Sequence, residues 1–389
     1  MNLEGVRVLD LSRLLPGPYA TQLLCDLGAD VIKIEDTGAG DYAREMPPIA
    51  ERGVGAIFEA VNRGKRSAAI DLKSDGGLEA FYALVEDADV VFEGFRPGVV
   101  DRLGIDYGTL REYTDDLVYC SLSGYGQTGP YADRVGHDIN YVGLAGLLDM
   151  TREDETSTPR VPGYQIADLG GGLFAAFAIV SGLLSRELGN GGTYVEVSMT
   201  DVVASFAQSI AVPALSGDDP RPGTTPLTGA YPCYDVYETA DGRYVTLGAL
   251  EPTFWEQFCH EVDRPELIDA HMSEDRAERR ALRETLEALF ATRSREEWIE
   301  TLSPESMTAP VLTPAEAFDH PQLVDRVVRR PADAPPRIGF PARGPHLPAE
   351  RDESIPTQGE HTAELLRAAG YDGATIDRLE GSGAILIRE

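Results

Sequence analysis

The chain has 389 residues, of which 42% are hydrophobic, so it is long enough for two domains and apolar enough for a full core. We expect no signal peptide, because no basic stretch precedes an apolar one at the start, and no membrane span, because no charge-free apolar run looks long enough. The four cysteines lack CxxC spacing, which indicates a reduced, cytoplasmic protein without a metal site or a disulfide framework.

The net charge of −31 is unusually negative, and only three of the 34 basic residues are lysines. Acidic side chains occur throughout the chain, which is typical of proteins from salt-accumulating halophiles, because strong screening makes self-repulsion tolerable. The alternative, an acidic face for a basic partner, would predict clustered acids. Nucleic-acid binding is not expected, since no basic patch with interleaved aromatic residues is present.

The first elements predict a doubly wound α/β domain. Residues 6–11 (VRVLDL) are predicted to form a strand, a turn and an amphipathic helix follow, and residues 31–35 (VIKIE) form the next strand. The first turn reads LLPGP and lacks GxGxxG. This counts against an NAD-dependent dehydrogenase, because the pyrophosphate needs glycine backbone at that place.

Further strand and helix segments continue to about residue 123, and the loops after the strands are rich in basic residues. All three lysines (Lys33, Lys65 and Lys73) fall in the first quarter of the chain, and Arg96 and Arg102 follow soon after. In a parallel sheet, ligands bind beyond the carboxyl ends of the strands. Positive charge at that edge of an acidic protein predicts an anionic ligand with phosphates. For any single residue, a loop charge paired with a neighbouring acid is the alternative.

Residues 161–172, VPGYQIADLGGG, hold the strongest catalytic candidate, Asp168. An apolar stretch of helical length begins directly after three glycines, so Asp168 and the glycines are predicted to form the turn that enters a buried helix. The first amides of a helix have no intrahelical partner and favour negative charge, and glycine lets another molecule approach the backbone. The alternative is that Asp168 is only the helix N-cap.

The remaining segments predict a second, smaller domain. Residues 216–229 are rich in Gly, Pro, Ser and Thr, as in a linker. Residues 230–250 are predicted to form a hairpin that turns at Ala240-Asp-Gly, and charged helical sequence follows through Leu302.

Taken together, these stretches resemble family III CoA-transferases (formyl-CoA and carnitine CoA-transferases), the superfamily that also contains 2-methylacyl-CoA racemases. The resemblance implies a Rossmann-like large domain formed by residues 1–200 and 324–389, a linker at 201–229, a small α+β domain at 230–323, and an interlocked homodimer. The matching pieces lie in family order from the N-terminus to His361: DLSRLLPGPYATQLLCDLGADVIKIE, GDYAR, NRGKRSAAIDLKS, EGFRPGVVDRLG, GYGQTGP, GHDINY, ADLGGG, VEVSMTDV, ALEPTFW and GEHT.

The resemblance also implies where CoA binds, as a substrate and not as a permanent cofactor. Many relatives have a basic residue near the adenosine phosphate where this chain has Asp36, so Arg44 or Lys73 would have to compensate. By position, the CoA contacts would be Ile70, Lys73, Gly94, Phe95, Arg102 and Leu103.

Two activities match the resemblance. In the transferases the residue that matches Asp168 is a nucleophile, which forms a mixed anhydride and then an aspartyl-CoA thioester. The N–H groups around Gly170, Gly171 and Gly172 would stabilise the oxyanions. In the racemases the residue at Asp168 is one of two acid/base groups, the other matches His137, and the residue at Glu251 orients that histidine.

We favour the transferase. Most of the superfamily are transferases, and Arg13, in the first strand–helix turn, could clamp the free carboxylate of a small diacid. The expected substrates are an acyl-CoA, for example succinyl-CoA, and a short carboxylic acid, which we expect to be dicarboxylic. A non-catalytic CoA-binding protein is disfavoured, because the reactive carboxylate of Asp168 is present.

Overall fold

The computed structural model describes residues 2–154, 156–332, 334–345, 347 and 354–388. The chain forms two compact units. The first unit consists of Met1–Gly146, Pro162–Phe206 and Arg326–Glu389, and the second of Leu147–Val161 and Ala207–Asp325. Against the expected boundaries, residues 147–161 belong to the second unit, and the expected linker at 201–229 contains helical segments.

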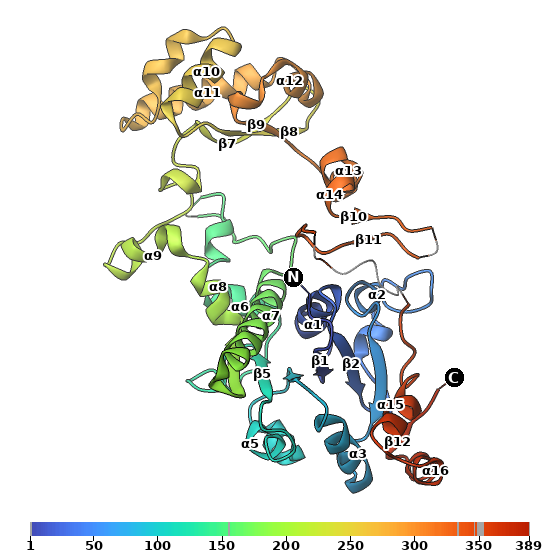
Figure 1. Ribbon diagram of the computed structural model, residues 1–389. Coiled ribbons are helices and arrows are strands. Elements are labelled where there is room, and N and C mark those ends of the chain that lie inside the picture. The colour runs from blue at the N-terminus through green and yellow to red at the C-terminus, as the bar shows by residue number, and fades with distance from the viewer. Residues whose placement is uncertain (1, 155, 333, 346, 348–353, 389) are drawn as a thin grey trace. The chain divides into compact units, whose positions relative to one another are not determined.

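The first unit is built on a seven-stranded sheet with the order β12-β3-β2-β1-β4-β5-β6 (Figure 1). Its six longer strands are parallel, and β12 pairs antiparallel with β3. This order, 3-2-1-4-5-6, is that of the doubly wound dinucleotide-binding fold, so the predicted α/β class is confirmed. The strands are β1 (Arg7–Asp10), β2 (Asp30–Glu35), β3 (Arg66–Ile70), β4 (Val90–Glu93), β5 (Val118–Ser123), β6 (Thr193–Ser198) and β12 (Ile385–Leu386).

Helices cover this sheet, and the C-terminal segment belongs to the same core. Leu365, Leu366 and Ile376 pack in one cluster with Ile32 of β2 and Phe81. Short apolar strands that are buried in this way need cover on both faces, which the crossover helices supply. The helices are α1 (Pro16–Asp26), α2 (Ala56–Val61), α3 (Asp75–Val85), α4 (Val99–Leu103), α5 (Tyr107–Leu110), α6 (Asp138–Leu144), α7 (Ile166–Ser185), α8 (Met199–Ser205), α15 (Thr362–Ala368) and α16 (Gly373–Gly381).

The second unit has a three-stranded antiparallel sheet formed by β7 (Tyr234–Glu238), β8 (Tyr244–Gly248) and β9 (Thr308–Val311). The hairpin predicted at Ala240-Asp-Gly is confirmed, with Gly242 at φ 70°, a conformation that favours glycine. Helices α10 (Pro252–Glu261), α11 (Arg276–Phe290) and α12 (Arg295–Thr301) lie on one side of this sheet (Figure 1). Their aromatic side chains Trp255, Phe258, Phe290 and Trp298 form the core of the unit.

One helix bears on the expectation about charge-free apolar runs, although its segment contains the charged residues Asp168, Arg186 and Glu187. In the described part of the chain, the helical segment Ile166–Asn190 is long and apolar enough to cross a membrane by length and composition. A buried core helix of a globular domain meets the same criterion. Here α7 packs against α1, α8 and β5 and buries Gly171, Ala175, Ile179 and Leu183.

Candidate active site

A cavity of about 1190 Å³ lies at the carboxyl ends of β1, β2, β3 and β4. This is the edge at which ligands bind in open parallel sheets, because the connecting loops diverge there. Tyr42, Arg96 and Asp133 also line it. The structure brings seven of the residues singled out in the sequence to this one cavity: Arg13, Ile70, Lys73, Gly94, Phe95, Arg102 and Leu103.

Four cations line this cavity: Arg13, Lys73, Arg96 and Arg102. Within the described part of the chain, none of the four makes an ion pair. In a protein of net charge −31, unpaired cations that share one cavity favour an anionic ligand.

Of the three lysines expected near a ligand, Lys73 lines the cavity, whereas Lys33 and Lys65 do not. Lys33, within β2, and Lys65, directly before β3, are buried. Lys33 Nζ lies 2.8 Å from Asp41 Oδ2, and Lys65 Nζ lies 3.3 Å from Asp10 Oδ2. These pairs neutralise charge inside the fold, where a lone ammonium would be costly, and leave neither lysine for a ligand.

The prediction that Arg44 contacts CoA also needs correction. Its guanidinium donates to both carboxylate oxygens of Glu35, at 2.8 and 2.6 Å, and to the carbonyl oxygen of Pro356. It also lies 4.0 Å from the ring centroid of Phe58. Because the buried carboxylate of Glu35 needs a charged partner, Arg44 has a structural role as that partner. Arg44 is not among the residues that line the cavity. Asp36 does line it.

Asp168 is the third residue of α7 and is half-buried. Burial raises the pKa of its carboxyl to about 7, and the negative charge of Asp138 adds to the rise. Asp138, the first residue of α6, accepts hydrogen bonds at Oδ1 from the amides of Ala167 and Asp168, at 2.7 and 3.1 Å. It therefore caps the helix that carries Asp168, a role that the sequence analysis missed although GHDINY contains the residue.

The glycines after Asp168 do not form the predicted turn. The i→i−4 ladder of α7 begins with Leu169 N–H and Gln165 O, so Gly170, Gly171 and Gly172 lie inside the helix, where their amides belong to the ladder. A Cβ at Gly171 would lie 2.6 Å from Met199 Cγ, and one at Gly172 would overlap the carbonyl oxygen of Pro16. The glycines thus allow close packing of α1 and α8 on α7 and are not free oxyanion donors.

His137 and Glu251, the other two catalytic candidates, lie in different units. His137 is exposed and is the N-cap residue of α6, directly before Asp138. Its N–H donates to Asn140 Oδ1 at 2.9 Å. His137 therefore stands beside the residue that caps the Asp168 helix. Glu251 precedes α10 in the second unit, so its contact with His137 stays a prediction.

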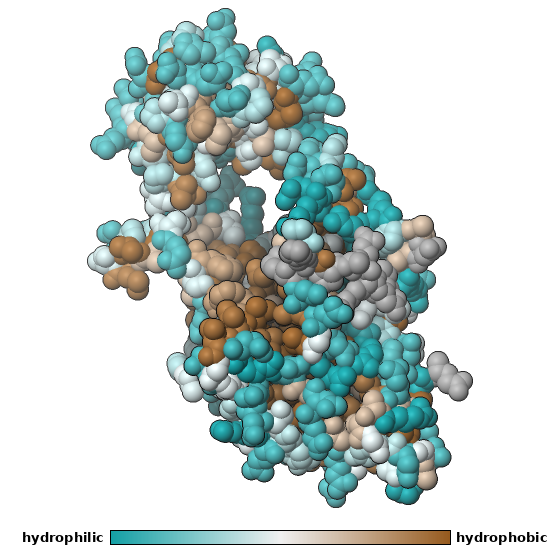
Figure 2. Space-filling model, viewed as in Figure 1, coloured by the Kyte–Doolittle hydropathy of each residue, from teal (hydrophilic) through white to brown (hydrophobic). Residues whose placement is uncertain are grey.

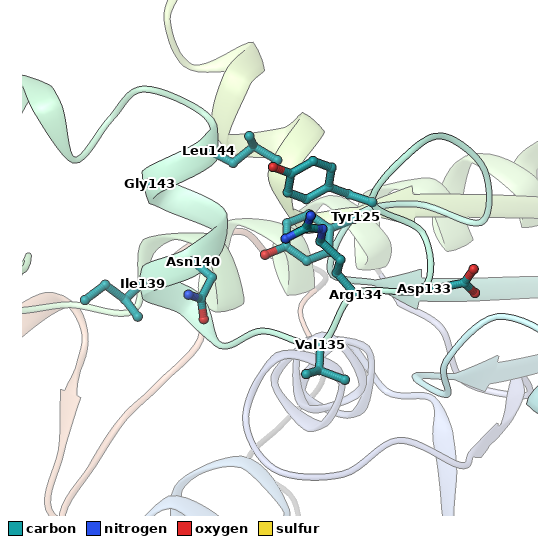
Figure 3. A pocket seen from close by; sticks show the side chains of 9 residues that line it. Tyr125, Asp133, Arg134, Val135, Ile139, Asn140, Gly143 and Leu144 are labelled. Atoms are coloured by element: carbon teal, nitrogen blue, oxygen red, sulfur yellow. The ribbon is translucent and has the colours of Figure 1, made fainter.

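A second pocket, of about 700 Å³, lies against α6 and shares Asp133 with the larger cavity. Figure 3 shows the Tyr125 and Arg134 side chains facing this helix. The Arg134 guanidinium lies 4.2 Å from the ring centroid of Tyr131, and Tyr125 packs edge-on against both Tyr131 and Tyr141. Nothing in the spacing of these aromatic residues indicated a pocket.

A doubly wound sheet, a cavity lined by four cations and a helix-borne carboxyl of raised pKa indicate an enzyme that acts on an anionic substrate. The chain belongs to CoA-transferase family III, whose sequence profile matches residues 3–362. The predicted family is thereby confirmed, and with it the prediction of an enzyme that uses CoA thioesters.

Three relatives show the range of the family. The chain is 35% identical to a succinyl-CoA:mesaconate CoA-transferase of Haloarcula hispanica, over 97% of this chain and 98% of the relative. It is 33% identical to an alpha-methylacyl-CoA racemase of Mus musculus, over 97% and 96%. The crystal structure of a CAIB/BAIF family protein from Brucella suis superposes with a TM-score of 0.82 at 31% identity, covering 94% of this chain and 99% of the other.

Proposed function

We propose that this protein moves CoA from a short-chain acyl-CoA, such as succinyl-CoA, to a short dicarboxylic acid through an aspartyl-CoA thioester on Asp168. One observation carries the proposal: Asp168 lies in the first turn of a crossover helix, at the same edge of the sheet as the cavity whose four cations have no ion-pair partner among the described residues. A crossover helix runs antiparallel to the strands that it connects, so its first turn faces the carboxyl ends of those strands. The nucleophile and the anion site are thus built on one edge.

The chemistry requires two exchanges at one carboxylate. The Asp168 carboxylate attacks the thioester carbonyl, which gives a mixed anhydride and releases CoA thiolate. The thiolate attacks the aspartyl carbonyl, which forms the aspartyl thioester and releases the donor acid. The incoming carboxylate attacks this thioester, which forms a new mixed anhydride and releases CoA thiolate again. The thiolate then attacks the acyl carbonyl of the anhydride, which gives the new acyl-CoA and frees the Asp168 carboxylate. Only the ionised carboxyl can begin the cycle, so the pKa of about 7 sets its lower pH limit.

We assign three of the four cations to the two ends of the substrates. Lys73 follows β3 and Arg102 lies in α4, which suits them to the phosphates of CoA. Arg13 lies in the loop that enters α1, and α1 packs closely on α7 at Gly172. We therefore assign Arg13 to the free carboxylate of the diacid. The Haloarcula relative is named a succinyl-CoA:mesaconate CoA-transferase, and the dicarboxylic character of both succinate and mesaconate supports this assignment.

We propose a homodimer as the working assembly. Apolar side chains gather over α7 on the surface (Figure 2). They follow the helical spacing along one exposed stripe, which a second copy would cover in the interlocked arrangement that the family resemblance implies. The stripe consists of Leu173, Phe174, Phe177, Leu184 and Leu188.

We also propose a salt-rich cytoplasm as the setting of the protein. The dispersed acidic residues and the similarity to the Haloarcula relative support this.

Racemisation of a 2-methylacyl-CoA is the second candidate. A pKa of about 7 suits Asp168 to proton transfer, and His137 lies beside the residue that caps its helix. The similarity to the mouse racemase also supports this candidate. A racemase reaction would require both Asp168 and His137 and would need no free acid.

One pair of measurements separates the two reactions. The protein is incubated with succinyl-CoA at molar KCl, and peptides are analysed by mass spectrometry for a CoA-sized adduct on Asp168. In parallel, a 2-methylacyl-CoA is incubated in D₂O. For a transferase we expect the unmodified protein to show the CoA-sized adduct on Asp168 and the Asp168→Asn variant to lack it. The His137→Ala variant should still transfer CoA at a measurable rate. Deuterium uptake at the turnover rate, with no adduct and no requirement for acid, would establish the racemase instead.

A further inference from the structure

The loop that carries Arg13 has an unusual backbone. Leu14 has φ 67°, a left-handed conformation that residues other than glycine rarely adopt. The Asp10 carboxylate accepts hydrogen bonds from the amide and the hydroxyl of Ser12, and Lys33 Nζ donates to the carbonyl oxygen of Ser12 at 2.9 Å. A conformation of this kind persists only where its surroundings hold it.

One buried carboxylate joins this loop to a second wall of the cavity. Asp41 Oδ1 accepts the amide of Leu14 at 3.0 Å and the amide of Ala43, also at 3.0 Å. Its other oxygen lies 2.8 Å from Lys33 Nζ, and both side chains are fully buried. Asp41 therefore cannot touch a substrate directly. It can act only through the two chain segments that it ties together.

Each of these segments presents one side chain to the cavity. Arg13 precedes Leu14, and Tyr42 follows Asp41. The Arg13 guanidinium lies 5.0 Å from the ring centroid of Tyr42 and 6.0 Å from that of Phe95. Arg13 has no ion-pair partner among the residues that the structure describes. A guanidinium stacked on an aromatic face keeps its N–H edge open to a carboxylate.

We propose that Asp41, balanced by Lys33, is a positioning residue that orients Arg13 on Tyr42 for the remote carboxylate of the acid substrate. This rests on the proposed function, because it assumes that Arg13 binds a diacid. Asp41 sets the affinity for that acid and does not take part in the chemistry at Asp168.

The test compares two double variants that both remove the buried charges. In K33M/D41N the side-chain oxygen of the asparagine can still accept hydrogen bonds from the amides of Leu14 and Ala43. In K33M/D41L the leucine side chain cannot accept these hydrogen bonds. Neither variant leaves a buried lone charge, which single substitutions would do. With succinyl-CoA as donor, KM is measured for glutarate and for valerate, a monocarboxylic acid of the same chain length.

We expect K33M/D41L to raise the KM for glutarate about tenfold relative to K33M/D41N, as for loss of one charge-assisted contact, with the KM for valerate unchanged. The difference should vanish when Arg13→Ala is added. If K33M/D41L does not fold, Leu14→Gly serves instead, because glycine accepts φ 67° but frees the loop. Leu14→Asn, which also tolerates that conformation, is its control.

Two results would overturn the positioning role: equal KM values for glutarate in the paired variants, or a difference that persists in the Arg13→Ala background. Failure of the proposed function looks different. If Arg13→Ala alone leaves the KM for glutarate unchanged, the diacid assignment falls and the role of Asp41 falls with it. If no CoA transfer occurs at all in the unmodified protein, the fault lies with the proposed reaction.

Discussion

Replacing Asp138 by asparagine should extend CoA transfer to lower pH. The Asn oxygen can still accept the amides of Ala167 and Asp168, so the cap of α7 is kept while the negative charge is removed. That charge is the second cause, after burial, of the raised pKa of Asp168. We expect the pKa to fall from about 7 by roughly one unit, or about 1.4 kcal/mol of interaction between the two carboxyls.

A lower pKa leaves more of the nucleophile ionised at a given pH. Near pH 6 the ionised fraction of Asp168 should rise from about one-tenth to about one-half, so kcat/KM should rise about fivefold, whereas near pH 8 it should hardly change. The assay is a pH profile of kcat/KM for transfer from succinyl-CoA. Asp138→Ala is the control, because it loses the cap as well and should cost about 1 kcal/mol of stability. An acid limb that stays in place in Asp138→Asn, or that moves to higher pH, would refute the reasoning.

Three further predictions follow from the same structure. Lys73→Ala and Arg102→Ala should each raise the KM for acyl-CoA about tenfold and leave that of the acid unchanged; Arg66→Ala, which removes a cation paired with Asp30 and Glu364, should change neither. Gly172→Ala should lower the free energy of unfolding by about 1–3 kcal/mol in a denaturant titration, because its Cβ meets the carbonyl of Pro16. Gly381→Ala is the control, because a Cβ at Gly381 would meet no other atom within 4 Å, and this variant should leave the free energy of unfolding unchanged or slightly higher. The melting temperature should fall between about 1 M and 0.1 M KCl, as the Debye length grows from about 3 to 10 Å; equal values would contradict the halophilic reading.

Local patterns in the sequence were sufficient to predict the parallel sheet and the edge at which the cavity lies, whereas most of the cavity residues were named from the family resemblance. Alternation and apolar runs marked the strands, and the Asp-Gly turn marked the hairpin of the second unit. The family resemblance named Ile70, Lys73, Gly94 and Phe95 as CoA contacts, and they line one cavity because each follows or ends a parallel strand, and parallel strands share one carboxyl edge. The position of Asp168 at the start of an apolar helix was also predicted, because a lone carboxyl directly before an apolar stretch of helical length is visible in the sequence.

The roles of the charges and of the glycines were decided only by tertiary structure. Lys73 and Lys65 look alike in the sequence, yet one lines the cavity and the other is buried against Asp10, 55 residues away. Arg44 likewise meets Glu35, and Gly172 meets Pro16 from a distant helix. Whether a charge is free for a ligand depends on which partner the fold brings to it, and burial of that partner is not encoded in any local pattern. Spacing along the chain thus indicates where a site lies, while packing between distant segments decides which side chains are left to serve it.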